Sequence, residues 1–298
     1  MDVRLIFSLL DSRIWDKVFK MTWDKKAMTK WYDNYAEKEE VSNDQIVSVT
    51  SARYKRIIRD IEKLISLLSL SNEDRVLDAG CGSGRFIYRI KKAKNCQIFG
   101  IDTSHNMIKR AKKKTPDANY LIADILHLPF RHNRFTVVVC YSVLWHIPPK
   151  RGLYFNSDVY EKGLKEFKRV LVRNGEMLFN ITNPFHLESI IGFFINIIKV
   201  KLLKNMGLQT YNMSIGKTQN ILTRLGFEIS DVVASGYYPL LLETLWIPFY
   251  SLPSENLINR YYDSFRHLEN SAGAKSLLRS FAHTFVIKAK DITNNDRI

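Results

Sequence analysis

Residues 76–84 (VLDAGCGSG) decide the fold of this 298-residue chain. An apolar strand over 75–79 runs into a turn with glycine at 80, 82 and 84, and a helix follows from about Arg85. Glycine adopts backbone conformations that a Cβ hinders, and it lets the backbone approach a ligand closely. The free N–H groups at the start of the next helix suit a carboxylate or a phosphate. We therefore expect a ligand to lie across this turn.

Outward from this turn, short buried strands alternate with charged helices. Strands separated by helices of this length indicate parallel crossovers and a sheet covered on both faces, which is the α/β class. Apolar residues at helical spacing also predict a helix over 46–70. The expected strands are 75–79, 97–102, 118–122, 136–141, 176–182, 227–234 and 282–289, and the other expected helices are 84–93, 104–114, 158–172 and 215–225.

The rest of the chain surrounds one domain over 46–290, which carries insertions at 185–213 and 236–278. A polar, aromatic segment (1–45) precedes the domain, and a polar tail (291–298) follows it. Apolar residues recur at helical spacing in 186–205, with lysines at one end. We expect the insertions to form a helical lid that contacts a lipophilic substrate or a membrane surface; packing of this helix on the core is the alternative.

Acidic residues follow three successive strands of the predicted sheet. Asp102 lies about 20 residues after the first glycine, where an acid binds the two hydroxyls of a ribose. A dinucleotide fingerprint would need a third glycine at the position of Arg85. Asp78 would repel a pyrophosphate but suits an ammonium group, and Asp124 could accept a hydrogen bond from an adenine amine, with Ile125 against the ring. Each acid alone could be a turn residue; together they indicate a ligand site.

These motifs resemble the class I S-adenosylmethionine-dependent methyltransferases, in particular the type 11 group that includes quinone-biosynthesis methyltransferases. The resemblance implies a Rossmann-like sheet of seven mostly parallel strands, with helices on both faces and an antiparallel last strand at 282–289, and S-adenosyl-L-methionine as the cofactor. The residues that carry it are 76–86 (VLDAGCGSGRF), 98–114 (IFGIDTSHNMIKRAKKK), 123–130 (ADILHLPF), 135–147 (FTVVVCYSVLWHI) and 168–179 (KRVLVRNGEMLF).

The resemblance also implies a set of cofactor-binding residues. The glycine turn would lie beside the methionine part of the cofactor, with Asp78 at its amino end. Asp102 would bind the ribose, and Asp124 the adenine amine. An aromatic residue upstream of the domain, here Tyr32, would close over the cofactor, although the family's second tyrosine is replaced by Glu39 and Glu40. The full set implied is Asp78, Gly80, Gly82, Gly84, Asp102, Met107, Asp124, Ile125, Tyr141, Ser142 and Tyr32.

His146 is the candidate catalytic residue. Methyl transfer from a sulfonium is an in-line displacement, so positioning of the acceptor supplies much of the rate and a base is optional. His146 follows the fourth strand, where it could deprotonate an acceptor hydroxyl or carbon acid. The alternative is a structural histidine that shapes the floor of the pocket.

Composition limits the protein class. Forty-five Lys and Arg against 30 Asp and Glu give a formal net charge of +15, which predicts attraction to nucleic acid, a membrane surface or a phosphorylated molecule. Three cysteines in no metal-binding spacing indicate reduced, buried thiols and no metal site. With no signal-peptide pattern and no long uncharged apolar stretch, we expect a cytoplasmic protein, with peripheral membrane contact as an extension.

Four functions remain for comparison. The leading hypothesis is a methyltransferase that acts on a small-molecule or lipid acceptor, because both insertions are apolar. The second is an RNA (tRNA) methyltransferase that uses the lysine clusters 91–94 and 109–114, although these clusters fall on helices away from the catalytic edge. A non-catalytic nucleotide-binding module and an NAD-dependent enzyme are weaker alternatives. The sequence does not predict the oligomeric state.

Overall fold

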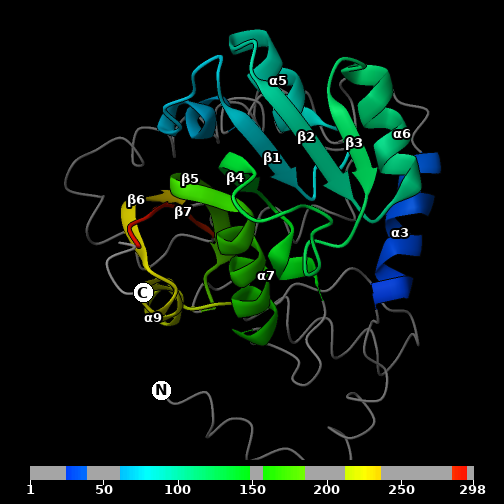
Figure 1. Cartoon of the computed structure of the whole chain (residues 1–298). Coiled ribbons are helices and arrows are strands. Elements are labelled where there is room, and N and C mark those ends of the chain that lie inside the picture. The colour runs from blue at the N-terminus through cyan, green and yellow to red at the C-terminus, as the bar shows by residue number, and fades with distance from the viewer. Residues whose placement is uncertain (1–24, 39–60, 148–156, 185–211, 236–283, 294–298) are drawn as a thin grey trace, which may run out of the picture.

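The computed structural model describes residues 25–38, 61–147, 157–184, 212–235 and 284–293. In these ranges, seven strands form one sheet in the order β3-β2-β1-β4-β5-β7-β6 (Figure 1). The first five strands pair in parallel, whereas β7 runs antiparallel to both of its neighbours. This confirms the predicted sheet with its antiparallel last strand. The strands are β1 (Arg75–Ala79), β2 (Gln97–Asp102), β3 (Asn119–Ile122), β4 (Phe135–Cys140), β5 (Leu171–Thr182), β6 (Phe227–Ser235) and β7 (Thr284–Asp291).

Helices cover both faces of this sheet. Successive side chains of a strand point to opposite faces, so each strand contributes to two cores. Val76 of β1 packs with α5 and α6, whereas its neighbour Leu77 packs with α7 and α9. The described helices are α3 (Lys25–Lys38), α5 (Arg85–Ala93), α6 (His105–Lys114), α7 (Ser157–Val170) and α9 (Ile215–Arg224), with a short 3₁₀ helix η1 (Leu144–His146) after β4. Residues 61–67 are also helical, within the helix predicted over 46–70.

The register of the parallel strands brings their carboxyl ends together. Ala79 of β1 lies opposite Ile101, and Asp102 lies opposite Ile122 of β3. The turns after β1, β2 and β3 therefore meet at one edge of the sheet, which we call the carboxyl edge. Ligands of open α/β sheets bind at this edge.

The start of β5 differs from the sequence prediction. The predicted helix 158–172 ends at Val170, and β5 begins at Leu171, five residues earlier than predicted. Leu171 pairs with Phe135, and the register then shifts before Val137 pairs with Glu176. Asn174, with φ 59°, lies within this irregularity. The turn at 173–175 is therefore a bulge inside the strand, which sequence periodicity could not show.

The predicted tail also begins in an ordered element. Asp291 is the last residue of β7 and is buried. Lys168 of α7 donates a hydrogen bond to its carboxylate, and the backbone N–H of Thr293 donates another at 3.0 Å. These bonds lower the pKa of Asp291 more than its burial raises it. Asp291, the first residue of the predicted tail 291–298, is therefore part of β7.

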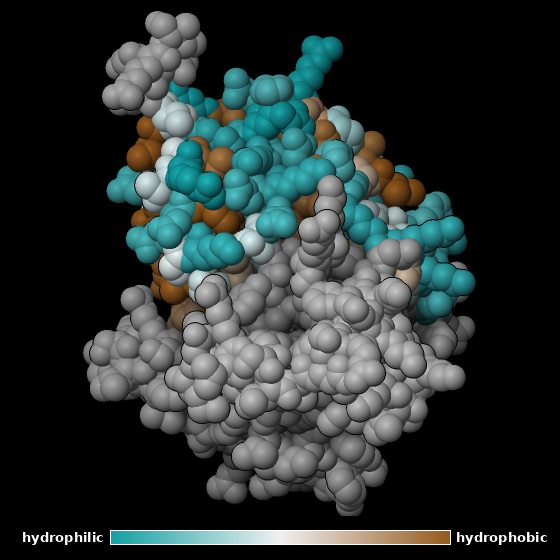
Figure 2. All heavy atoms as spheres, turned by 90° about the horizontal axis from the view of Figure 1, so that it is seen from below, coloured by the Kyte–Doolittle hydropathy of each residue, from teal (hydrophilic) through white to brown (hydrophobic). Residues whose placement is uncertain are grey.

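Helices α5 and α6 each end in a cluster of lysines. Lys91 and Lys92 are in the last turn of α5, and 112–114 are in the last turn of α6, where cations stabilise the helix dipole. These turns lie at the opposite edge of the sheet from the glycine turn. Figure 2 shows hydrophilic side chains over much of the described part of one face, with hydrophobic residues scattered among them.

Two further sequence expectations concern thiols and membrane spans. All three cysteines are free and buried, as predicted. Among the residues that the structure describes, no helix has the length and apolar character needed to cross a membrane. The predicted lid (185–213 and 236–278) lies outside the described residues, apart from 212–213.

Candidate functional site at the carboxyl edge

The glycine turn is hydrogen-bonded to β2 on one side and borders open space on the other. The backbone N–H groups of Gly80 and Cys81 both donate to the carbonyl of Ile101 at 2.8 Å, which ties the turn to β2. A Cβ on Gly80, at φ +86°, would lie 2.3 Å from Cγ2 of Val143. A Cβ on Gly82, at φ +51°, would meet nothing within 4 Å. The turn therefore needs glycine at 80 for packing, whereas at 82 the backbone borders open space that a ligand can enter.

Two acids lie beneath this turn, Asp78 buried and Asp102 partly buried. Asp102 accepts hydrogen bonds from the backbone N–H groups of Gly82 and Ser104, each at 2.9 Å. Burial raises the pKa of Asp102, and these N–H groups partly offset that effect. Asp78 is 3% exposed, and burial together with the charge of Asp102 raises the pKa of Asp78 to about 8. A cation at this point would favour the charged form of Asp78.

Helix α3 is bound to the carboxyl edge along one side. Lys25 Nζ lies 2.5 Å from Oδ2 of Asp124, and the hydroxyls of Thr29 and Thr103 are 3.2 Å apart. Asp33 accepts hydrogen bonds from the hydroxyl of Ser104 at 2.5 Å and from the backbone N–H of Asn106 at 3.2 Å. Figure 1 shows α3 running beside α6. Part of the upstream segment (1–45) is therefore a component of this edge, and sequence reasoning missed the contacts of Lys25 and Asp33.

Asp124 is held in its ionised form by several donors. Its Oδ1 accepts from the backbone N–H of Leu126 at 2.9 Å, and Nδ1 of His127 lies 3.5 Å from its Oδ2. Burial raises the pKa of Asp124, but the hydrogen bond and charge of Lys25 and the other donors outweigh it, so the pKa is lowered overall. The predicted adenine-binding acid thus shares its oxygens with protein groups before any ligand binds.

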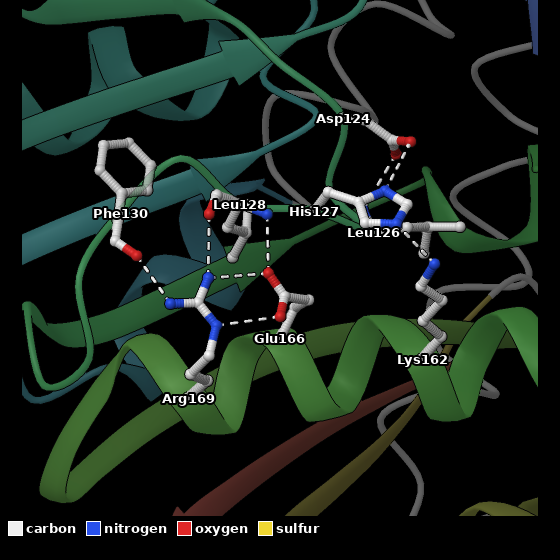
Figure 3. Close-up of polar contacts among 8 residues, drawn as sticks. All are labelled: Asp124, Leu126, His127, Leu128, Phe130, Lys162, Glu166 and Arg169. Atoms are coloured by element: carbon white, nitrogen blue, oxygen red, sulfur yellow. Dashed lines mark hydrogen bonds and ion pairs between the residues drawn. The ribbon is translucent and has the colours of Figure 1, made fainter.

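The loop that carries Asp124 is fastened to α7 (Figure 3). Arg169 donates to the carbonyls of Leu128 at 2.9 Å and Phe130 at 2.7 Å, and its side chain pairs with Glu166 at 2.8 Å. Glu166 in turn accepts from the backbone N–H of Leu128 at 2.7 Å. Neighbouring Ile125 is buried in the core. These bonds fix the backbone on which Asp124 and Ile125 stand.

The end of β4 forms the other side of the edge. The rings of Tyr141 and Phe86 are 5.4 Å apart, which packs Tyr141 against α5. Ser142 has φ 60°, and its backbone N–H donates to Oδ1 of Asn180 in β5 at 2.7 Å. This bond holds an unusual backbone conformation at the point where the chain leaves the sheet. Asn180 was not predicted, although a polar residue within the predicted strand 176–182 was a possible signal.

His146 lies in an aromatic cluster between η1 and α3. Its ring centroid is 5.5 Å from that of Trp145 and 6.2 Å from that of Tyr32. Tyr32 also meets Trp31 edge to face at 5.1 Å. The structure therefore brings His146 and Tyr32 together, as neighbours of the carboxyl edge. Met107, in the first turn of α6, is buried, with its N–H donating to the hydroxyl of Ser104.

Comparison with known proteins agrees with this geometry. A family model described as "Methyltransferase domain", of the type 11 family, matches residues 77–179. This part of the chain is a class I S-adenosylmethionine-dependent methyltransferase domain. The sheet and the glycine turn of this domain agree with the resemblance to the family, which residues 76–86 and the other quoted motifs carried.

Two curated relatives and one solved structure illustrate the methyltransferase family. A malonyl-[acyl-carrier protein] O-methyltransferase from Hamiltonella defensa is 32% identical over 121 residues, which are 40% of this chain and 42% of that protein. A demethylmenaquinone methyltransferase from Thermotoga maritima is 24% identical over 155 residues, 52% of this chain and 61% of that protein. The chain thus spans less than two thirds of the length of these relatives.

The solved structure is magnesium protoporphyrin IX methyltransferase from Synechocystis with bound S-adenosylmethionine. It matches with a TM-score of 0.54 and 13% identity, and the match covers 91% of this chain and 98% of that chain. At this identity the likeness shows the fold alone.

The cofactor of the methyltransferase family is S-adenosylmethionine. The edge residues fit such a ligand. Gly82 borders open space, Asp78 offers a carboxylate for an ammonium group, and Asp102 offers one for hydroxyl donors. Among the described residues, no group of three or more His, Cys, Asp or Glu side chains is arranged to hold a metal ion.

Proposed function

We propose that the protein is a methyltransferase that moves a methyl group from S-adenosylmethionine to a small, lipophilic acceptor. The observation that carries the proposal is the pair of acids, buried Asp78 and partly buried Asp102, beneath a glycine turn whose Gly82 borders open space. When bound, the cofactor supplies an electrophilic methyl group on sulfur. Apart from a base where the acceptor needs one, the reaction needs binding and orientation, which this chain's own side chains would supply.

Each edge residue has a role in this proposal. Asp78 binds the ammonium group, and the turn at 80–84 accommodates the methionine chain. Asp102 binds the ribose hydroxyls. Asp124 accepts from the adenine amine with a lone pair that Lys25 and His127 leave available, while Met107 and Ile125 contact the ring. Tyr141 and Ser142 border the sulfonium, and Tyr32 closes the site from α3.

The role of Asp102 can be tested by its removal. Asp102→Ala should weaken binding of S-adenosylmethionine by at least about 30-fold, because it removes two charge-assisted hydrogen bonds, each contributing about 1–2 kcal/mol. The measurement is calorimetric titration with the cofactor. Asp117→Ala is the matched control, since Asp117 pairs with Lys91 near the opposite edge. Equal affinity of Asp102→Ala and wild type would refute the ribose contact.

Fewer observations bear on the methyl acceptor than on the cofactor. Support for a small, lipophilic molecule comes from the similarity to a demethylmenaquinone methyltransferase and from the apolar sequence of 186–205. The lysines at the ends of α5 and α6 give little support for the RNA alternative, because they lie at the edge away from the turn. Membrane contact through 186–205 remains an extension of the proposal.

His146 is the proposed general base where the acceptor needs deprotonation. Its aromatic neighbours Tyr32 and Trp145 would equally position it as a wall of the acceptor pocket. The pH dependence of methyl transfer separates the two roles, since a base gives a titration that a wall does not.

The direct test of the whole proposal is incubation with methyl-labelled S-adenosylmethionine and fractionated cell extract. Lipid, small-molecule, RNA and protein fractions are then counted separately. Label in the lipid or small-molecule fraction is expected. Label in RNA alone would refute the small-molecule acceptor, and no label in any fraction would refute the activity.

A further inference from the structure

Three buried polar atoms at the end of β5 have no hydrogen-bond partner within the part of the chain that the structure describes. They are Nδ2 of Asn180, Oγ1 of Thr182 and Oδ1 of Asn212, in residues that are 2%, 1% and 1% exposed. Buried polar atoms in folded proteins are nearly always paired, because an unpaired one loses its bonds to water without replacement. A set of three in one place therefore needs a physical reason.

The three side chains share one side of the sheet. Asn180 and Thr182 alternate along β5 with Ile181, so both lie on the face of Leu178, which packs with α5. The backbone N–H of Met213 donates to the carbonyl of Thr182 at 3.3 Å, which brings 212–213 beside the strand end. Met213 packs in the core of the opposite face, so extended-chain alternation directs Asn212 to the face of Thr182.

This set joins the proposed cofactor site through Asn180. Its Oδ1 accepts from the backbone N–H of Ser142 at 2.7 Å. That bond fixes which end of the amide faces the loop after β4, and it leaves Nδ2 as a donor with no partner. The unpaired atoms therefore lie next to the loop that would border the reacting sulfur.

We propose that Asn180, Thr182 and Asn212 bind the polar end of the methyl acceptor, and that this end is an uncharged hydroxyl or enol. The inference rests on the proposed methyltransferase function. A hydroxyl oxygen accepts from Nδ2 of Asn180, and its hydrogen is donated to Oδ1 of Asn212, while the Thr182 hydroxyl can donate or accept. Such a group offers each of the three atoms a complementary hydrogen-bond partner.

The chemistry of the set favours a neutral group over an anion. Amide and hydroxyl side chains bring no formal charge to compensate a buried phosphate, and burial of an uncompensated charge is costly. The set therefore selects an apolar molecule with a hydroxyl, not a nucleic-acid backbone. These three residues are specificity residues, because they would contact the acceptor and not the cofactor.

The test uses Thr182→Val, which removes the hydroxyl and keeps the shape. Thr115→Val is the matched control, since the Thr115 hydroxyl is also buried and unpaired but lies at the C-terminus of α6. Both variants should fold, because each loses only an unpaired polar atom. Methyl-labelled S-adenosylmethionine and the small-molecule fraction of cell extract are the substrates.

For Thr182→Val we expect at least a tenfold rise in the amount of extract needed for half-maximal labelling, with unchanged affinity for S-adenosylmethionine. Thr115→Val should match wild type in both. Asn180→Asp is a second variant, because it keeps the acceptor for Ser142 and loses the donor; it should show the same rise. The labelled product should pass an anion-exchange column as a neutral compound.

The outcomes separate the two levels of the proposal. If wild-type protein labels an acceptor and both Thr182→Val and Asn180→Asp label it at the wild-type concentration dependence, this inference is wrong and the methyltransferase function stands. A labelled product that is anionic also overturns the inference alone. If wild-type protein labels nothing, the function fails, and the inference fails with it.

Discussion

The two halves of the carboxyl edge differ in charge and in how they are held. At the ends of β1, β2 and β3, the edge is acidic: Asp78, Asp102 and Asp124 stand there, and backbone N–H groups or Lys25 bind two of them. At the end of β5, the buried polar groups are neutral, and three of their atoms are unpaired. This difference supports our proposal that one half receives a cationic, hydroxyl-rich cofactor and the other a neutral acceptor.

The strongest expected difference between the halves is their response to pH. With its pKa raised to about 8, Asp78 keeps a proton in the folded state that it loses in the unfolded state above about pH 4. The folded state binds more protons in this window, so Asp78 makes stability fall as pH rises from about 4 to about 8, by up to about 1.4 kcal/mol per pH unit.

Urea unfolding at pH 5, 6, 7 and 8 measures this effect. Asp78→Asn cannot titrate, so its free energy of unfolding should fall less steeply with pH than that of wild type. Binding of S-adenosylmethionine at pH 7 should release close to one proton, seen as a dependence of the calorimetric enthalpy on buffer. Parallel pH profiles for the two proteins would show that Asp78 is already ionised in the free protein.

A pair of glycine substitutions separates packing from ligand contact on the acidic half. Gly80→Ala places a Cβ 2.3 Å from Val143 at a positive φ, and should cost about 3 kcal/mol of stability. Gly82→Ala meets no atom within 4 Å and should cost only about 1 kcal/mol, from its positive φ.

Chemical denaturation and cofactor titration distinguish these two variants. Gly82→Ala should bind S-adenosylmethionine at least tenfold more weakly despite its small loss of stability, because its methyl group projects into the space that the ligand would enter. Wild-type affinity in Gly82→Ala would mean that the cofactor does not approach this position.

The prediction with the smallest expected effect tests how far the proposed acceptor site extends beyond the end of β5. The hydroxyl of Tyr160 is also buried and unpaired, but Tyr160 belongs to α7, on the opposite face of the sheet from Thr182. Tyr160→Phe should therefore raise the free energy of unfolding by about 1 kcal/mol and leave acceptor use unchanged. A weaker apparent affinity for the acceptor in this variant would extend the acceptor site through the sheet to α7.

The acidic half was predictable from sequence because its signals are local. A glycine turn after a buried strand and an acid about 20 residues later follow from chain geometry, so the turn and Asp102 were predicted to border one ligand site; in the structure the N–H of Gly82 donates to Asp102. The seven-stranded sheet and its antiparallel last strand came from the family resemblance. Element ends were less predictable: the bulge at Asn174 left no periodic signal.

The neutral half and the α3 contacts depend on long-range packing. Lys25 reaches Asp124 across 99 residues, and Asn180 reaches Ser142 across 38. No rule of sequence spacing predicts either pair. Taken alone, Lys25 resembles an ordinary surface lysine and Asn180 an ordinary asparagine in a strand. The sequence could therefore locate the proposed cofactor half, whereas the proposed acceptor half became visible only in the folded structure.

The most direct test of the division is one labelling experiment on two variants, with both substrate concentrations varied. Asp102→Ala should raise the apparent KM for S-adenosylmethionine and leave that for the extract unchanged, while Thr182→Val should do the reverse. If the two variants change the same KM, or neither changes either, the carboxyl edge is not divided into a cofactor half and an acceptor half.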